Sequence, residues 1–201
     1  MTIKVTLISP VLTAAAREAR FDDGCPPDPV ALRQARAAAG TLLSADRTVC
    51  SPTVRCRRTA AALALDGAGE PAALAPCAMG RWQGRTLAEV GAAEPEAVAA
   101  WLADPSAVPH GGESLVELCA RVGGWLAATA ELPGRVTAVV EPDVLRAALV
   151  HALDLPRPAF WRLDAPPLTA VELSGRAGRW NLRVGRPLTP AETRDDTGAA
   201  S

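Results

Sequence analysis

The fold of this chain is decided by the stretch Cys50–Ala60, which reads CSPTVRCRRTA. The short apolar run Thr48–Cys50 leads into it and is typical of a buried strand. Ser51-Pro52 interrupts that run, and an arginine- and alanine-rich helix is expected from residue 53 to residue 65. A strand that passes through a tight loop into a helix is typical of proteins in which strands and helices alternate.

The flanking sequence repeats this alternation. Asp28-Pro29 offers an N-cap followed by a proline at the first helical position. The expected helices cover residues 28–43, 53–65, 86–102 in short pieces, 114–130 and 144–153, and the expected strands cover residues 3–8, 48–50, 72–75 and 135–140, with an antiparallel pair at 168–173 and 179–184. We therefore predict an α/β fold with a mostly parallel central sheet, helices on both faces and the antiparallel pair at one edge.

Length and composition favour a single globular unit. The chain has 201 residues, of which 49% are hydrophobic and 21% charged, and this length can bury one sizeable core. We predict one domain over residues 1–186 and a polar, disordered tail over residues 187–201. Only Lys4 of the 21 basic residues is a lysine, a bias that we interpret as that of a GC-rich bacterial gene.

Charge and hydropathy argue against several classes of function. The net charge is −1, so no basic field is expected to attract nucleic acid or an anionic membrane. No stretch approaches the roughly 18 apolar residues of a membrane span. The apolar run at the N-terminus stops at Pro10, which is too early for a signal peptide. We therefore expect a cytoplasmic protein with neither nucleic acid nor membrane as a partner.

Four segments, in order, match the pattern of one known family. Cys50–Ala60 resembles the SSPLxRAxxTA segment of the histidine phosphatase (phosphoglycerate mutase-like) superfamily. Gly80–Thr86, which reads GRWQGRT, is similar to its GxWEGxT, and Pro109–Ser114, PHGGES, to its PxGES. Val139–Leu149 is similar to VVSHGGVIRALL. The resemblance covers most of residues 1–186 and implies a three-layer α/β/α sandwich with its site above the carboxyl ends of the central strands.

The family's chemistry requires residues that this chain does not hold at the matching positions. In the family a histidine in RHGE attacks phosphorus, while arginines and a second histidine neutralise the phosphoryl oxygens. Counted back from Arg20-Phe21, which resembles the family's RF, this motif falls on Ser9–Thr13, so that Ser9 and Pro10 stand where arginine and the nucleophilic histidine are usual. Proline offers no side-chain nucleophile.

The other catalytic positions differ as well. The second histidine falls on Glu141, and the acid that protonates the leaving oxygen falls on Pro76 in an alignment without gaps. Arg55 is retained, with Arg20 as a candidate helper. Two unit charges about 4 Å apart interact by roughly 4 kcal/mol at an effective dielectric constant of 20, so the Glu141 carboxylate would oppose a bound phosphate. We therefore expect no phosphohistidine chemistry.

Several residues around the expected pocket allow two interpretations. Arg55 is either an anion-binding fork or a partner of Glu141, and Glu141 is either its counter-charge or a base or cation ligand. His110 is either a base or ligand-binding group or a partly exposed loop residue. Trp82 offers a ring for a flat ligand, and Glu113 borders the pocket or serves the N-cap region of the following helix.

The remaining candidates favour structural roles. Trp101, Trp125 and Trp161 are expected to pack in the core or an interface, and His151 on its apolar helix is interpreted as structural. Cys50, Cys56 and Cys77, with His110 and Glu141, would form a soft metal site if they met in space. Their spacing does not require this, and buried core thiols are the preferred interpretation. The sequence therefore predicts no metal, no cofactor and no disulfide framework.

These observations lead to one main hypothesis and two alternatives. The main hypothesis is a pseudo-phosphatase that serves as a binding or regulatory module for a small metabolite or a protein partner, with Arg55 as an anchor and a homodimer as a possible assembly. The alternatives are an enzyme repurposed around Glu141, His110 or a cysteine, and a residual phosphomonoester hydrolase. Convergence of Glu141 and His110 would favour the repurposed enzyme, whereas an Arg55–Glu141 pair would favour the module.

Overall fold

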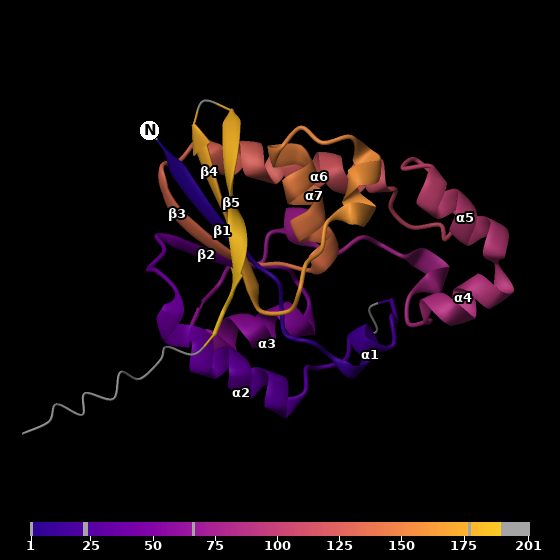
Figure 1. Cartoon of the computed structure of the whole chain (residues 1–201), viewed down its shortest axis with the longest axis horizontal. Helices are drawn as coiled ribbons and strands as arrows, with labels where there is room; N and C mark the ends of the chain where they lie inside the picture. Colours follow the sequence, from indigo (N-terminus) through magenta and orange to yellow (C-terminus); the bar gives the residue numbers. More distant parts are fainter. Residues whose placement is uncertain (1, 22–23, 66, 177, 190–201) are drawn as a thin grey trace, which may run out of the picture.

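The computed structural model describes residues 2–21, 24–65, 67–176 and 178–189. In this part of the chain one sheet runs through the molecule in the strand order β2-β3-β1-β4-β5 (Figure 1). Its strands are β1 (Ile3–Ile8), β2 (Arg47–Cys50), β3 (Gly134–Val139), β4 (Thr169–Arg176) and β5 (Arg179–Pro187). β2, β3 and β1 are parallel, while β4 and β5 are antiparallel additions at one edge. The predicted α/β fold is confirmed.

Helices cover both faces of the sheet. They are α1 (Ala14–Arg17), α2 (Pro29–Ala38), α3 (Val54–Ala62), α4 (Leu87–Ala93), α5 (Pro95–Ala103), α6 (Leu115–Ala130) and α7 (Pro142–Ala152). One apolar cluster joins the sheet to α6 and α7, and a second joins its other face to α2 and α3. α4 and α5 extend away from the sheet on the side of α7 (Figure 1). No described helix has both the length and the apolar character needed to cross a bilayer.

The strand predicted at residues 72–75 is wrong. Ala72–Leu74 forms a single 3-10 turn, in which the Leu74 N–H donates to the carbonyl oxygen of Pro71 at 2.9 Å. Pro71 and Pro76 flank the segment, and neither proline can donate a hydrogen bond to a neighbouring strand. The segment is therefore a turn rather than a strand, and residues 75–79, which follow it, line the pocket described below.

The last described strand reaches the first residue of the predicted tail. β5 continues to Pro187, and Leu188 is buried, with its N–H donating to the Leu168 carbonyl oxygen at 2.7 Å. Residues 190–201, which make up most of the predicted tail, lie outside the described residues.

Candidate functional site

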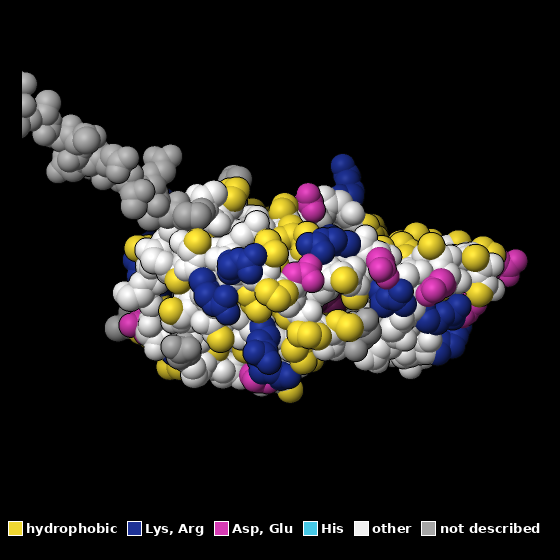
Figure 2. All heavy atoms as spheres, turned by 90° about the horizontal axis from the view of Figure 1, so that it is seen from below, with side chains coloured by type: hydrophobic (Ala, Val, Ile, Leu, Met, Phe, Trp, Pro, Cys, Tyr) yellow, Lys and Arg dark blue, Asp and Glu magenta, His cyan; other side chains and the backbone are white. Residues whose placement is uncertain are grey.

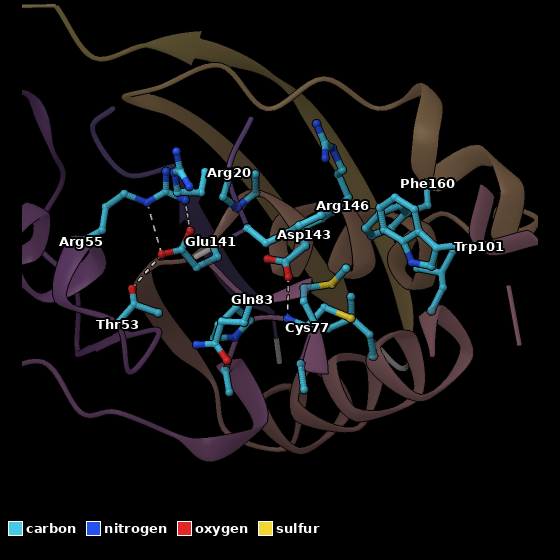
Figure 3. A pocket seen from close by; sticks show the side chains of 18 of the residues that line it. Arg20, Thr53, Arg55, Cys77, Gln83, Trp101, Glu141, Asp143, Arg146 and Phe160 are labelled. Atoms are coloured by element: carbon cyan, nitrogen blue, oxygen red, sulfur yellow. Dashed lines mark hydrogen bonds and ion pairs between the residues drawn. The ribbon is translucent and has the colours of Figure 1, made fainter. Parts of the chain in front are cut away.

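A cavity of about 540 Å³ lies above the carboxyl ends of the parallel strands. Segments that follow β1, β2 and β3 reach it, as expected for an open α/β sheet. Its lining consists of Arg20, Phe21, Pro52, Thr53, Arg55, residues 75–79, Gln83, Trp101, Leu115, Leu118, Glu141, Pro142, Asp143, Arg146, Phe160 and Trp161. The close-up shows Arg20, Arg55 and Glu141 on one side, Phe160 and Trp101 on the other, and Asp143 and Arg146 between them (Figure 3).

The charged end is built around Glu141, the N-cap of α7. Its carboxylate accepts hydrogen bonds from the Thr53 hydroxyl at 2.7 Å and from Arg55 Nε at 3.3 Å, and Arg55 Nη2 pairs with its second oxygen. The Cys56 thiol lies 3.4 Å from the same Oε1 atom. The Glu141 side chain is only 6% exposed and that of Arg55 17%. The structure thus brings together Arg55 and Glu141 as a buried ion pair.

The electrostatics of this end follow from burial and from the Glu141 charge. Burial alone would lower the pKa of Arg55, but the hydrogen bond and charge of Glu141 raise it above the ordinary arginine value. Burial raises the pKa of the Cys56 thiol well above its usual range, and the neighbouring carboxylate adds to this effect. Cys56 is therefore a neutral thiol, unsuited to act as a nucleophile.

Asp143 occupies the middle of the pocket, two residues into the chain turn that starts α7. Its Oδ2 atom accepts the Cys77 N–H at 2.6 Å, and its Oδ1 atom accepts the Val144 N–H at 2.9 Å. Burial raises the pKa of Asp143 to about 6, an effect that the Cys77 hydrogen bond opposes and the Glu141 charge reinforces. Burial likewise raises the pKa of the adjacent Cys77 thiol to about 12.

The far end of the pocket is aromatic. Trp101 on α5 and Trp161 on the 3-10 helix Arg157–Arg162 meet edge to face, with ring centroids 4.6 Å apart. Phe160 contacts Trp161 in the same way at 5.0 Å. Trp161 packs against the hydrophobic core, as does Trp125, in agreement with the sequence prediction. Trp101 and Trp161 are in addition partly exposed and line the cavity, a role that the sequence did not predict for them. No local pattern marks them, since α5 meets the 157–162 segment only in the folded chain.

The segment around the predicted nucleophile position does not reach the cavity. Ser9 is buried, and its hydroxyl bonds to the carbonyl oxygens of Pro166 and Thr169 while accepting the Thr169 N–H. Pro10 is buried as well, and neither residue is part of the pocket lining. Pro76 and Arg20 do line the pocket. Arg20 donates to the Gly84 carbonyl oxygen at 2.8 Å and pairs with Glu18.

His110 and Trp82 lie outside the lining. Trp82 is fully buried and stacks on Phe21 at 5.8 Å between ring centroids. His110 is 1% exposed rather than partly exposed, and its Nδ1 atom accepts the Gly112 N–H at 3.0 Å. Burial lowers the pKa of His110, and the nearby Arg81 charge lowers it further. The imidazole is therefore neutral, with its proton on Nε2, and it is not gathered with Glu141 in the pocket.

Glu113 supports the pocket from behind. It holds Arg121 through two hydrogen bonds of 2.8 and 2.6 Å. Arg121 in turn donates to the carbonyl oxygens of Ala73 and Ala75, each at 2.9 Å. The capping of α6 is performed by Ser114 together with Glu117. Glu113 therefore fixes the 72–77 segment and so the position of the Cys77 N–H.

Backbone contacts explain the glycines of two motif loops. A side-chain carbon added at Gly112 would fall far inside contact distance of the Ala78 carbonyl oxygen, and one at Gly80 would meet the His110 carbonyl oxygen. The loops are joined by the Glu113 N–H, which donates to Ala78 at 2.8 Å, and by the Arg81 N–H, which donates to His110 at 3.0 Å. The 78–84 and 109–114 loops therefore pack backbone to backbone.

Among the described residues no metal site is found, and the face shown in Figure 2 is not of one charge sign. Within the described ranges no group of three His, Cys, Asp or Glu residues is arranged to hold a metal ion. Cys50, Cys56, Cys77 and Cys119 are free thiols, and all of them except Cys77 are buried. On the face shown in Figure 2, basic and acidic side chains are interleaved with hydrophobic ones rather than gathered by sign.

Comparison with known proteins places this architecture in a family. Residues 23–185 match the family described as histidine phosphatase superfamily (branch 1). The chain therefore belongs to the histidine phosphatase superfamily, as the sequence resemblance predicts. No curated protein matches it.

Solved structures agree with this assignment. A structure described as mycobacterial hydrolase 1 is 26% identical, with a TM-score of 0.80 over 92% of this chain and 98% of its own. A mycobacterial glucosyl-3-phosphoglycerate phosphatase is 25% identical, with a TM-score of 0.77 and the same coverage. An alpha-ribazole phosphatase from Shigella flexneri shares the fold at 20% identity, with a TM-score of 0.80 over 92% of this chain and 97% of its own.

Proposed function

We propose that this protein is a histidine phosphatase homologue that has lost phosphohistidine chemistry and serves as a small-molecule binding module. The observation that carries the proposal is the Arg55–Glu141 ion pair. Glu141 stands where the family resemblance places the second histidine, and its oxygens accept hydrogen bonds from Thr53 and Arg55. Groups that would otherwise hold a phosphate are thereby directed to a carboxylate of the protein itself.

The energetics of the pair support this interpretation. A buried charge that loses its partner costs several kcal/mol, so Arg55 does not readily leave Glu141 for an external anion. A phosphate entering beside Glu141 would also meet its negative charge. A phosphohistidine route further needs a nucleophile, and Pro10 at the matching position supplies none.

The cavity supports a ligand-binding role. A volume of about 540 Å³ lies within the usual range of about 300–1,000 Å³ for small-molecule sites. Its lining combines apolar and aromatic side chains with a few polar groups, as such sites usually do. A homodimer and a cytoplasmic location stay predictions.

The alternative enzyme built on Glu141 and His110 has less support. His110 is buried against Trp82, with ring centroids 5.1 Å apart, and lies outside the pocket lining. Its Nδ1 atom is engaged by the Gly112 N–H. A general base must reach the proton that it removes, whereas the Nε2 atom of His110 is buried and His110 is not among the residues that line the cavity.

Turnover of p-nitrophenyl phosphate tests the proposal. The wild-type chain is compared with Arg55→Ala and with Arg57→Ala, a matched arginine on the exposed side of α3 that pairs with Glu70. We expect no release of p-nitrophenol above background, or the same trace in all three preparations, as a contaminant would give. Turnover that Arg55→Ala abolishes and Arg57→Ala retains would contradict the proposal.

A further inference from the structure

One carboxylate of the pocket has no charged partner. Glu141 pairs with Arg55, and the neighbouring Glu113 pairs with Arg121. Asp143 lines the cavity as well, and among the described residues no cationic side chain forms a salt bridge with it; its carboxylate accepts backbone N–H groups, among them those of Cys77 and Val144. A carboxylate offers about four acceptor positions, so Asp143 retains acceptor capacity toward the cavity.

Arg146, three residues further along α7, forms no salt bridge with Asp143. Its Nε atom donates to the Leu163 carbonyl oxygen at 2.8 Å, and its guanidinium carbon lies 5.9 Å from the centroid of the Phe160 ring. In Figure 3 its guanidinium points away from Asp143. The residue is thus held at the rim by a carbonyl and an aromatic ring.

The residues around Asp143 indicate which class of ligand would pair with its carboxylate. Trp101, Phe160 and Trp161 form the aromatic end of the same cavity. Aromatic faces attract cations, and they also provide flat apolar surfaces for stacking. A carboxylate without a salt bridge that shares a cavity with aromatic rings therefore favours a ligand that carries a positive charge and a flat apolar group. An anionic ligand would meet Asp143 and Glu141 with a charge of the same sign.

We propose that this pocket binds an amine with a flat apolar group, whose ammonium pairs with Asp143 while its apolar group lies against Trp101 and Trp161. The inference rests on the proposed function, because a phosphate in the old site would compete for the same cavity. With Arg55 paired to Glu141 and with Asp143 in the lining, the cavity would accept a cationic ligand in place of a phosphate.

Titration calorimetry with three indoles tests the charge preference. The probes are tryptamine, which is cationic at pH 7.5, 3-methylindole, which is neutral, and indole-3-propionate, which is anionic. We expect tryptamine to bind at least about tenfold more tightly than either of the others, since hydrogen bonds to charged groups contribute about 1.5–3 kcal/mol. Equal affinity for the three probes, or tighter binding of the anion, would overturn the proposal.

A matched pair of aspartate variants locates the charge. Asp143→Asn is expected to weaken tryptamine binding by roughly tenfold to a hundredfold. Asp164→Asn is the control, because Asp164 is exposed, lies outside the lining and accepts the N–H of its next residue, Ala165, as Asp143 accepts that of Val144. Trp101→Ala should weaken binding of tryptamine and 3-methylindole alike. Unchanged tryptamine affinity in a folded Asp143→Asn variant would contradict the assignment.

The pH dependence of wild-type binding gives a test that needs no variant. A primary amine stays protonated well below its pKa of about 10, whereas Asp143 takes up its proton near pH 6. Charged and titratable groups that act on Asp143 are Glu141, Arg55, Cys77 and Arg121. Tryptamine affinity should fall about tenfold per pH unit below pH 6 and level off above it. A flat profile from pH 5 to pH 7.5 would contradict a role for Asp143.

The same preparation separates failure of this inference from failure of the proposed function. Phosphomonoester turnover that depends on Arg55 would remove the proposed function. If that turnover is absent and tryptamine does not bind more tightly than the other two indoles, the proposed binding module would stand and only the proposed amine ligand would be wrong.

Discussion

Two carboxylates at the start of helix α7, Glu141 and Asp143, line the same pocket but differ in their partners. Glu141, at the N-cap of α7, receives Arg55 and Thr53 from the neighbouring α3 segment. Asp143, two residues later, accepts only backbone N–H groups and lies between the charged and the aromatic sides of the cavity (Figure 3). The charge of Glu141 is therefore balanced within the protein by Arg55, whereas Asp143 forms no salt bridge with any of the described residues.

This difference arises from the distribution of arginines around α7. Arg121 approaches from α6 but is committed to Glu113 and to two carbonyl oxygens of the 72–77 segment. Arg146 is committed to Leu163 and Phe160. The number of charged residues near a pocket therefore says little about which ligand the pocket prefers. A charge that already has a partner within the protein contributes less to ligand binding than an unpaired one.

The largest effect is expected from breaking the charged end. Glu141→Gln leaves Arg55 buried without a counter-charge and should lower the free energy of unfolding by about 3–5 kcal/mol. Glu70→Gln is the matched control. Glu70 pairs at the surface with Arg57, which lies on the same helix as Arg55, and the two side chains are 38% and 46% exposed. Its loss should be about 0–1 kcal/mol. Urea unfolding of both variants measures the difference.

The same variant has a second readout. With Glu141 neutral, Arg55 and Thr53 become available to an anion, so inorganic phosphate should raise the thermal midpoint of Glu141→Gln more than that of the wild type. Equal destabilisation by the two glutamate variants would show that the charged end is no more than an ordinary surface pair.

The next largest effect concerns the ionisation of Asp143. Its pKa rises from 3.8 to about 6 on folding, so between these values the folded state binds more protons than the unfolded state. Stability must then fall as pH rises from about 4 to 6, by up to about 3 kcal/mol, since one pKa unit corresponds to about 1.4 kcal/mol. Asp143→Asn should lack this fall, and Asp164→Asn should retain it, in urea titrations across the window.

His110 affects the same pH range with the opposite sign. Its pKa is lowered on folding, so the unfolded state binds more protons and stability decreases as pH falls through about 6.5. This contribution is common to the wild type and both aspartate variants, and it cancels in their difference. Identical pH profiles for the wild type and Asp143→Asn would rule out the raised pKa.

The smallest effect tests the loop that supports both ends. Gly112→Ala forces a side chain against the Ala78 carbonyl oxygen and should cost about 1–3 kcal/mol, as overpacking does, while displacing the segment that carries Cys77. Gly124→Ala, in the exposed middle of α6 with no atom near the added carbon, should instead stabilise the protein by up to about 1 kcal/mol. Denaturant midpoints with unchanged slopes measure both. A neutral Gly112→Ala would contradict the close loop packing.

The sequence alone predicted the scaffold because its signals are local. Apolar runs, N-caps and prolines define the strands and helices from β1 to β5, and the four motif segments indicated the superfamily to which residues 23–185 belong. The segment at 72–75 was one exception, because its two flanking prolines prevent strand pairing. The short helix α1 and the 3-10 helix Arg157–Arg162 were not predicted either. Retention of Arg55 and the presence of Glu141 at a histidine position were also visible in the sequence.

The tertiary structure decided which of these residues meet. It paired Arg55 with Glu141, buried His110 and Trp82 away from the cavity, and brought Trp101 and Trp161 to its wall. It also brought Asp143 to the cavity wall, a residue that no sequence pattern had singled out. Sequence order determines where a side chain is attached, but a charge or a ring acquires its role from partners on other elements, and those partners are fixed only when the sheet and its helices pack.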